Sequence, residues 1–163
     1  CDQLRPLSRG EVKLHSSDPR DRPAAHFNYL NEPYDLRELV EGLKAMQDIL
    51  TQPAFDPFRG RRITPAPEVL SDRELEAFVR NTATTDYHPC GTCKMGNDEM
   101  AVVDQELRVR GVDGLRIVDA SVMPDIISGN LNAPTQMVAE HRLNRLPRQN
   151  TRPVQFTAIQ HHL

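Results

Sequence analysis

The spacing of apolar residues predicts an amphipathic helix over residues 35–50. Apolar side chains recur there at helical intervals and form one face: Leu36, Leu39, Val40, Leu43, Met46, Ile49 and Leu50. Asp35 and Glu38 have the spacing of a capping box, which predicts the first turn, and Gln52-Pro53 predicts the end of the helix. A helix with one apolar face needs a second element to cover that face.

A second amphipathic helix is predicted over residues 71–83. Ser71 and Glu74 again have capping-box spacing, and an apolar side is supplied by Leu75, Phe78 and Val79. The stretch between the two helices, residues 53–70, is rich in Pro, Arg and Gly, which predicts irregular structure.

The remaining pattern predicts short strands and a third helix. "GEVKLHS" (10–16) alternates, with Val12 and Leu14 on one face, as in a short edge strand. "AVVDQELRV" (101–109) and "GLRIVDAS" (114–121) are β-type runs separated by the turn sequence "RGVDG". The Gly- and Asn-rich loop "SGNLNAPT" leads into "QMVAEHRLNRL" (136–146), a predicted helix with a narrow apolar face. The predicted class is therefore mixed, α+β or α/β.

Composition adds that the chain has little material for a core. Apolar residues make up 38% of the 163 residues and there is no Trp, whereas globular chains average about 45–50%. This favours an extended protein or a piece of a larger one, an expectation that the absent initiator Met supports. The net charge of −3 argues against a nucleic-acid partner, and no apolar run reaches the length of a membrane span.

The stretch "DYHPCGTCKMG", residues 86–96, concentrates the candidate chemistry. His88, Cys90 and Cys93 have a spacing that can serve zinc, and Cys90 with Cys93 can form a redox dithiol. The third possibility is that the cysteines pack and His88 alone does chemistry.

The rest of the chain favours the third possibility. Structural zinc normally takes four ligands, and no second ligand pair exists at metal-binding spacing. The H-x-E half that zinc deaminases combine with P-C-x-x-C is absent as well. A redox dithiol needs a helix to start near its cysteines, but Gly96-Asn97-Asp98 follows. No metal is therefore expected. A hydrogen-bonded structural histidine remains the plain alternative for His88.

The order of motifs from Tyr87 to Thr135 resembles the C-terminal signature of the glucose–methanol–choline (GMC) family of flavin-dependent alcohol oxidoreductases. The matching motifs are "YHPCGTCKMG", "AVVD", "GLRIVDASVMP" and "SGNLNAPT". Upstream, "RPLSRGEVKLHSSDPRDRP", "FNYL" and "DLRELVEGLKAM" are also similar to the family's substrate domain. The likeness runs from about residue 4 to 139 and is greatest to the choline-type members.

The resemblance implies a role for each matching residue. His88 corresponds to the base that takes the alcohol proton while hydride passes to FAD, and Asn130 to the second active-site position. Further residues correspond to segments along the flavin: Asp119, Ala120, Asn130, Asn132, Pro134 and Thr135. For Asp119, a turn-capping role is as good an interpretation as cofactor contact. Asn130 and Asn132, taken without the motif, are ordinary turn residues.

The resemblance also implies an organisation. The family's G-x-G-x-x-G loop is absent from this sequence, so we expect most of the FAD site to lie in an N-terminal segment outside it. Residues 1–85 would belong to the substrate domain, 86–146 to the closing part of the FAD domain, and 147–163 to a polar tail.

Function, partners and location follow as expectations. The implied substrate is choline or another primary alcohol, oxidised to an aldehyde. The implied location is cytoplasmic, with peripheral membrane association of the longer protein also compatible. A flavin-free remnant acting as an interaction module is the alternative, motivated by "HRLNRLPRQN", which replaces the family's small, apolar final helix and makes its docking doubtful.

Overall fold

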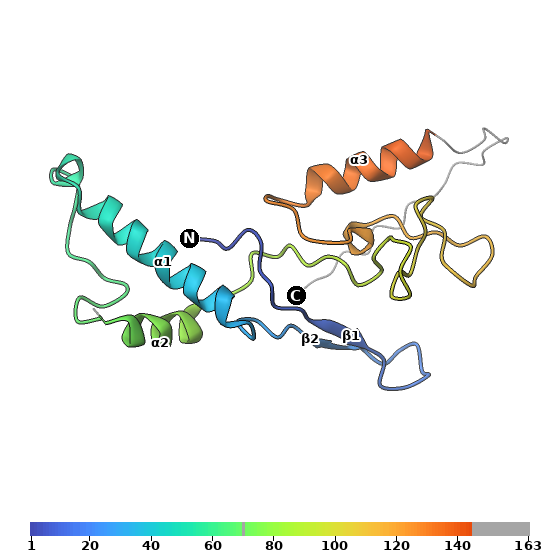
Figure 1. The fold of residues 1–163 in the computed structure, drawn as a ribbon, viewed down its shortest axis with the longest axis horizontal. Helices are drawn as coiled ribbons and strands as arrows, with labels where there is room; N and C mark the ends of the chain where they lie inside the picture. The colour runs from blue at the N-terminus through green and yellow to red at the C-terminus, as the bar shows by residue number, and fades with distance from the viewer. Residues whose placement is uncertain (70, 145–163) are drawn as a thin grey trace.

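A computed structural model describes residues 1–69 and 71–144 (Figure 1). The elements in chain order are β1 (Glu11–Lys13), β2 (Ala24–His26), α1 (Pro33–Thr51), η1 (Pro53–Phe55), α2 (Asp72–Thr82), η2 (Ala120–Val122) and α3 (Asn132–Leu143). Helices α1 and α2 lie at one end of an elongated molecule, and α3 lies over irregular chain at the other. This mixed α/β content agrees with the predicted class.

Helices α1 and α2 pack on each other through the apolar faces that the sequence predicts. Their shared core consists of buried side chains from both helices: Leu36, Val40, Leu43, Leu75 and Val79. The capping box predicted for α2 is present, with the Ser71 side chain accepting from the Glu74 backbone N–H and the Glu74 carboxylate accepting from the Ser71 N–H. The later part of the α1 face is uncovered, because Ile49 and Leu50 are about half exposed.

The start of α1 differs from the prediction. The helix begins at Pro33, since proline suits a first helical position, and Asp35 lies inside the first turn and not at the cap. The Asp35 carboxylate is buried and accepts hydrogen bonds from Gln3 Nε2 (3.0 Å), Leu7 N (2.8 Å) and Ser8 N (2.8 Å). The prediction of a capping box formed by Asp35 and Glu38 was therefore wrong. Asp35 instead anchors the N-terminal segment to α1.

The predicted edge strand forms as β1, which pairs antiparallel with β2 in a two-stranded sheet. The register places Glu11 opposite His26, Val12 opposite Ala25 and Lys13 opposite Ala24. Val12 remains half exposed and Leu14, which lies beyond the strand, is mostly exposed. Within the described residues, the alternating face of this hairpin is not buried.

The two β-type runs after residue 100 do not form regular strands. They make isolated bridges instead, between Met95 and Val103, Val103 and Val109, and Arg108 and Arg116. The physical reason is a tight turn that the β-type composition does not reveal: Asp104 Oδ1 accepts from the Glu106 and Arg108 N–H groups, and Leu107 has a φ of 59°. The predicted turn at "RGVDG" is present, with Gly111 and Gly114 both at φ 76°.

These runs still supply a second core. Val103, Leu107 and Val122 are buried together, and Val138 of α3 packs against them. Helix α3 begins at Asn132, within the predicted loop and four residues ahead of the predicted start at Gln136. Arg142, in its last turn, forms an ion pair with Glu106. Of the altered segment at 141–150, the structure describes residues 141–144, and there Arg142 contacts a neighbouring element; the rest lies outside the described residues.

The two cores lie on either side of the predicted boundary at residue 85, which supports the domain assignment but leaves it a prediction. Residues 145–146 of the predicted third helix and the predicted tail at 147–163 fall outside the described residues. No helix in the described part of the chain is long and apolar enough to cross a membrane.

Candidate active site

His88 and Asn130 are in direct contact although they are 42 residues apart in the sequence. The Asn130 Nδ2 atom lies 2.9 Å from His88 Nε2. An amide nitrogen can only donate, so Nε2 accepts in this arrangement and the neutral imidazole carries its proton on Nδ1. The His88 side chain is 26% exposed. The site therefore has one acceptor and one donor at the same accessible place, and the two are paired with each other.

The segment carrying His88 is fixed to η2 by backbone hydrogen bonds. Cys93 N donates to Ser121 O (3.0 Å) and Met95 N donates to Val122 O (2.8 Å). Gly91 has a φ of 85°, which favours glycine, and a Cβ there would lie 3.4 Å from Met123 O. The loop that bears the histidine is thus joined to the second core, which limits its freedom.

Asn130 stands immediately before α3. The next residue, Leu131, is buried, and its carbonyl accepts from both Thr135 N (3.0 Å) and Thr135 Oγ1 (2.7 Å). Thr135, one of the residues predicted near the cofactor, therefore stabilises the first turn of the helix beside the site. Asn132 is exposed and its Oδ1 accepts from Gln136 Nε2 (3.0 Å), whereas Pro134 is partly buried.

Asp119 takes the turn-capping role that the sequence left open. Its carboxylate accepts from the Ser121 N–H (2.8 Å) as the cap of η2, and Ala120 follows as the first residue of η2. Asp119 is exposed, so capping leaves part of the carboxylate accessible. Its contact with a cofactor stays a prediction.

The residues present fit part of a flavin. Leu131, the N-cap residue of α3, makes no side-chain capping hydrogen bond, so its side chain satisfies none of the first backbone N–H groups. Those groups follow directly after Asn130, and a helix N-terminus favours an electron-rich or anionic group. Asn132, Pro134 and Thr135 are the residues that would lie along such a group.

The cysteines behave as packing residues. Cys90 and Cys93 are free and partly buried. Burial raises the pKa of the Cys90 thiol, the Asp125 carboxylate raises it further, and Arg9 opposes them. A raised pKa disfavours the thiolate that redox or metal chemistry requires. Among the described residues, no group of three or more His, Cys, Asp or Glu side chains could hold a metal ion.

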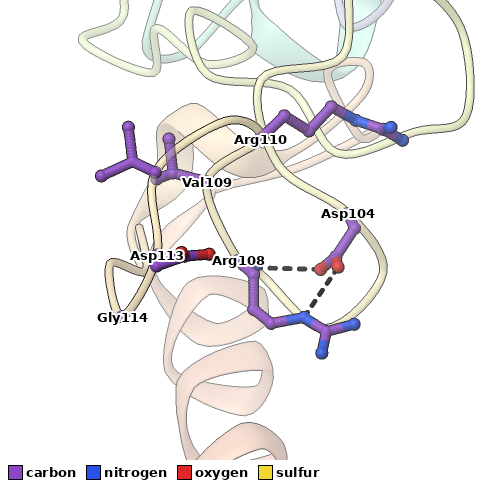
Figure 2. A pocket seen from close by; sticks show the side chains of 7 residues that line it. Asp104, Arg108, Val109, Arg110, Asp113 and Gly114 are labelled. Atoms are coloured by element: carbon purple, nitrogen blue, oxygen red, sulfur yellow. Dashed lines mark hydrogen bonds and ion pairs between the residues drawn. The ribbon is translucent and has the colours of Figure 1, made fainter.

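A surface hollow of about 300 Å³ lies elsewhere. It is formed around the turn that Asp104 closes, where the Asp104 carboxylate accepts from Arg108 N and Nε, and Gly114 forms part of its wall (Figure 2). None of the predicted site residues lines it. We therefore assign the candidate chemistry to His88 and Asn130 and not to this hollow.

Asp86 is a neighbour of the site that was not predicted from the sequence. Asp86 Oδ2 lies 3.9 Å from His88 Nε2, close enough to interact with the imidazole once it is protonated. The signal for it was its position two residues before the histidine. Because the Asp86 side chain is 72% exposed, water strongly screens its interaction with the imidazole.

Comparison with known proteins places this arrangement in a family. A sequence profile described as GMC oxidoreductase matches residues 6–139. The oxygen-dependent choline dehydrogenase of Burkholderia cenocepacia is 56% identical over 137 residues, which are 84% of this chain and 24% of that protein. The enzyme of the same name from Klebsiella pneumoniae is also 56% identical, over 84% of this chain and 25% of that protein. The chain thus spans about a quarter of the length of these relatives.

Solved structures are similar to this chain in fold as well as in sequence. Pyridoxine 4-oxidase from Mesorbium loti superposes with a TM-score of 0.79 at 34% identity, over 86% of this chain and 28% of that one. An FAD-dependent oxidoreductase from Chaetomium thermophilum gives a TM-score of 0.80 at 29% identity, over 86% and 25%. With its motifs, fold and paired His88 and Asn130, the chain belongs to the GMC oxidoreductase family.

Proposed function

We propose that this chain is the C-terminal portion of an FAD-dependent alcohol oxidoreductase that converts a primary alcohol to an aldehyde, with choline as the first candidate substrate. The observation that carries the proposal is the 2.9 Å contact between Asn130 Nδ2 and His88 Nε2. The similarity to choline dehydrogenases supports the substrate class.

The His88–Asn130 pair matches what an alcohol hydroxyl requires. The hydroxyl has one proton to donate and an oxygen that can accept, and the pair offers an acceptor at Nε2 and a donor at Nδ2. His88 Nε2 takes the proton as general base once the alcohol hydroxyl replaces Asn130 Nδ2 as the partner of its lone pair. Asn130 holds the oxygen and stabilises the negative charge that develops on it.

FAD supplies the acceptor for the hydride that leaves the alcohol carbon. Within this chain, the uncapped start of α3 and the residues Asn132, Pro134 and Thr135 would lie against the cofactor. The greater part of the cofactor would be held by a segment outside this sequence, which contains no G-x-G-x-x-G loop. After proton transfer, the negative Asp86 carboxylate lies near the positive imidazolium and partly compensates its charge.

The proposal is tested by replacing the base in the full-length protein that carries this segment. We expect His88→Ala to lower the rate of anaerobic flavin reduction by choline about 10²–10⁴-fold, the usual contribution of a general base. Bound FAD should remain at one per protein, because His88 is not expected to carry cofactor affinity. The measurement is stopped-flow absorbance, repeated with other primary alcohols to rank the substrates.

The matched control is His15→Ala, which removes an exposed histidine near the β1–β2 hairpin. It should reduce flavin at the normal rate. A normal rate in the His88→Ala protein would remove His88 as the base.

The cytoplasmic location, with peripheral membrane association of the longer protein as an option, is part of the same proposal and is checked by fractionation of cells that express it.

The flavin-free remnant, which was motivated by residues 141–150, has less support than the flavoenzyme. Of those residues the structure describes 141–144, where Arg142 forms an ion pair with Glu106, and the family similarity favours an enzyme. We therefore keep the flavoenzyme as the single proposed function.

A further inference from the structure

The loop that carries Asn130, residues 124–130, has little support of its own. Among the described residues, none from 124 to 130 makes a backbone–backbone hydrogen bond. The local support is a short turn in which Asp125 Oδ1 accepts from Ile126 N (2.8 Å). The placement of the Asn130 carboxamide therefore depends on contacts from elsewhere in the chain.

Two arginines of the N-terminal segment supply those contacts. Arg9 Nη2 lies 3.0 Å from Asp125 Oδ1, and Arg5 Nε donates to Ser128 Oγ at 2.7 Å. These residues are more than a hundred positions from the loop in sequence, so the contacts are long-range. Together they bracket the loop, one near its start and one two residues before Asn130.

The segment that bears these arginines is itself firmly held. Backbone N–H groups of Leu7 and Ser8 donate to the buried Asp35 carboxylate of α1. Arg9 is fixed from both sides, since its Nη1 donates to Pro6 O (2.8 Å) and its carbonyl accepts from Asn28 Nδ2 (3.1 Å). A rigid support can position a loop, whereas a freely moving one cannot.

The Arg9–Asp125 pair also borders the histidine loop. Both charges act on the thiol of Cys90, whose pKa Asp125 raises and Arg9 lowers, besides the larger effect of burial. Cys90 is two residues from His88. The pair therefore lies within electrostatic reach of the segment that carries one catalytic side chain, and directly supports the loop that carries the other.

We infer that Arg9 is a positioning residue for the proposed oxidation: its ion pair with Asp125 holds the 124–130 loop so that the Asn130 carboxamide meets His88. Arg5, through Ser128, is the second support. The inference rests on the proposed function. The Arg9 and Asp125 side chains are 59% and 67% exposed, so their ion pair contributes little to the free energy of unfolding. Losing the pair should therefore lower the reaction rate and leave the stability of the protein almost unchanged.

The test uses the full-length flavoprotein with Arg9→Met, which keeps the length of the side chain but removes the charge, and Asp125→Asn, which keeps the oxygen that Ile126 N requires. We expect each to lower kcat about two- to fivefold with a smaller change in KM, since an exposed ion pair can shift the placement of the loop by no more than that. FAD content and Tm should stay unchanged. Arg20→Met, which breaks an exposed ion pair with Asp18, is the matched control and should have no effect.

Combination with Asn130→Ala separates positioning from a general structural role. If Arg9 acts through Asn130, Arg9→Met should cost little more once the carboxamide is gone. Arg9→Lys should restore part of the rate, because a lysine can still meet Asp125. A loss of the same size in the Asn130→Ala background would overturn the inference, as would a normal kcat in both Arg9→Met and Asp125→Asn. If His88→Ala and Asn130→Ala are themselves fully active, the proposed function fails instead.

Discussion

Asp35 and Ser71 begin the same local pattern, yet they have different roles. Each has a Glu three residues later, and each was predicted to cap a helix, but only Ser71 does so. The Asp35 carboxylate instead accepts hydrogen bonds from the N–H groups of Leu7 and Ser8, which are 28 and 27 positions away. Local spacing carries no information about such partners, and Pro33 was the local signal for an earlier helix start.

The proposed catalytic pair shows a related limit. Motif resemblance selected His88 and Asn130 from the sequence, but their 2.9 Å contact is a property of the fold. The ion pair between Arg9 and Asp125, the proposed support of that contact, was not predicted, because an arginine and an aspartate 116 residues apart have no recognisable pattern.

At the residue scale, we predict that Asp35→Asn destabilises the protein at neutral pH by about 1–3 kcal/mol, the cost of disturbing buried hydrogen bonds. Burial raises the pKa of Asp35, but hydrogen bonds from Ser8, Leu7 and Gln3 outweigh it, so the pKa lies below its usual value. The contribution of the carboxylate is therefore complete above the unfolded pKa of about 4 and is lost as pH falls through the folded pKa.

Thermal unfolding of the full-length protein at several pH values measures this effect. The gap in Tm between the parent and Asp35→Asn should be widest near pH 7 and should narrow in acid. Asp48→Asn, an exposed aspartate on the same helix, is the control and should leave Tm nearly unchanged. A gap that widens in acid would contradict the assigned role of Asp35.

At the element scale, helices were predicted well and strands poorly. The apolar periodicity of α1 and α2 survives in the structure because their own packing buries it. The β-type run at residues 101–109 did not become a strand, because the Asp104 turn folds the chain back within the run. Such a run can still supply core residues, as Val103 and Leu107 do, without fixing how far a strand extends.

The capping box of α2 gives a prediction for one element. Ser71→Ala removes the acceptor for the Glu74 N–H, which should cost about 1 kcal/mol of helix stability. We expect hydrogen exchange in the first turn of α2 to accelerate about fivefold in the full-length protein, measured by mass spectrometry. Ser71→Asp, which retains a capping oxygen, should keep the protection of the parent. Equal exchange in all three proteins would show that tertiary packing alone sets the stability of this turn.

At the scale of the whole molecule, the described chain has much apolar surface and two separate cores. Ile49 and Leu50 of α1, and Phe27 and Tyr29 after β2, are each about half exposed. The shortage of apolar residues in the composition predicted a small core. It did not predict where the open surface lies, because that depends on which elements cover one another.

This surface leads to a prediction about the isolated chain. We expect the 163 residues, purified alone, to carry no flavin absorbance and to enhance the fluorescence of an apolar dye such as ANS. The full-length protein should carry flavin and enhance the dye little. The reason is that, under the proposed function, most of the cofactor site and the cover for the open apolar faces belong to a segment outside this sequence. Flavin co-purifying with the isolated chain would contradict the prediction.

The bonds that join the histidine loop to η2 have a consequence for enzyme engineering. Since Cys93 and Met95 are paired with Ser121 and Val122, we expect the stretch from Asp86 to Leu131 to be transferable between relatives as one block. A chimera with a crossover inside that block would combine the proposed base and carboxamide from different parents on mismatched supports. A crossover in the irregular chain between α2 and Asp86 should keep the block whole, provided that the donor's arginine-bearing N-terminal segment is transferred with it.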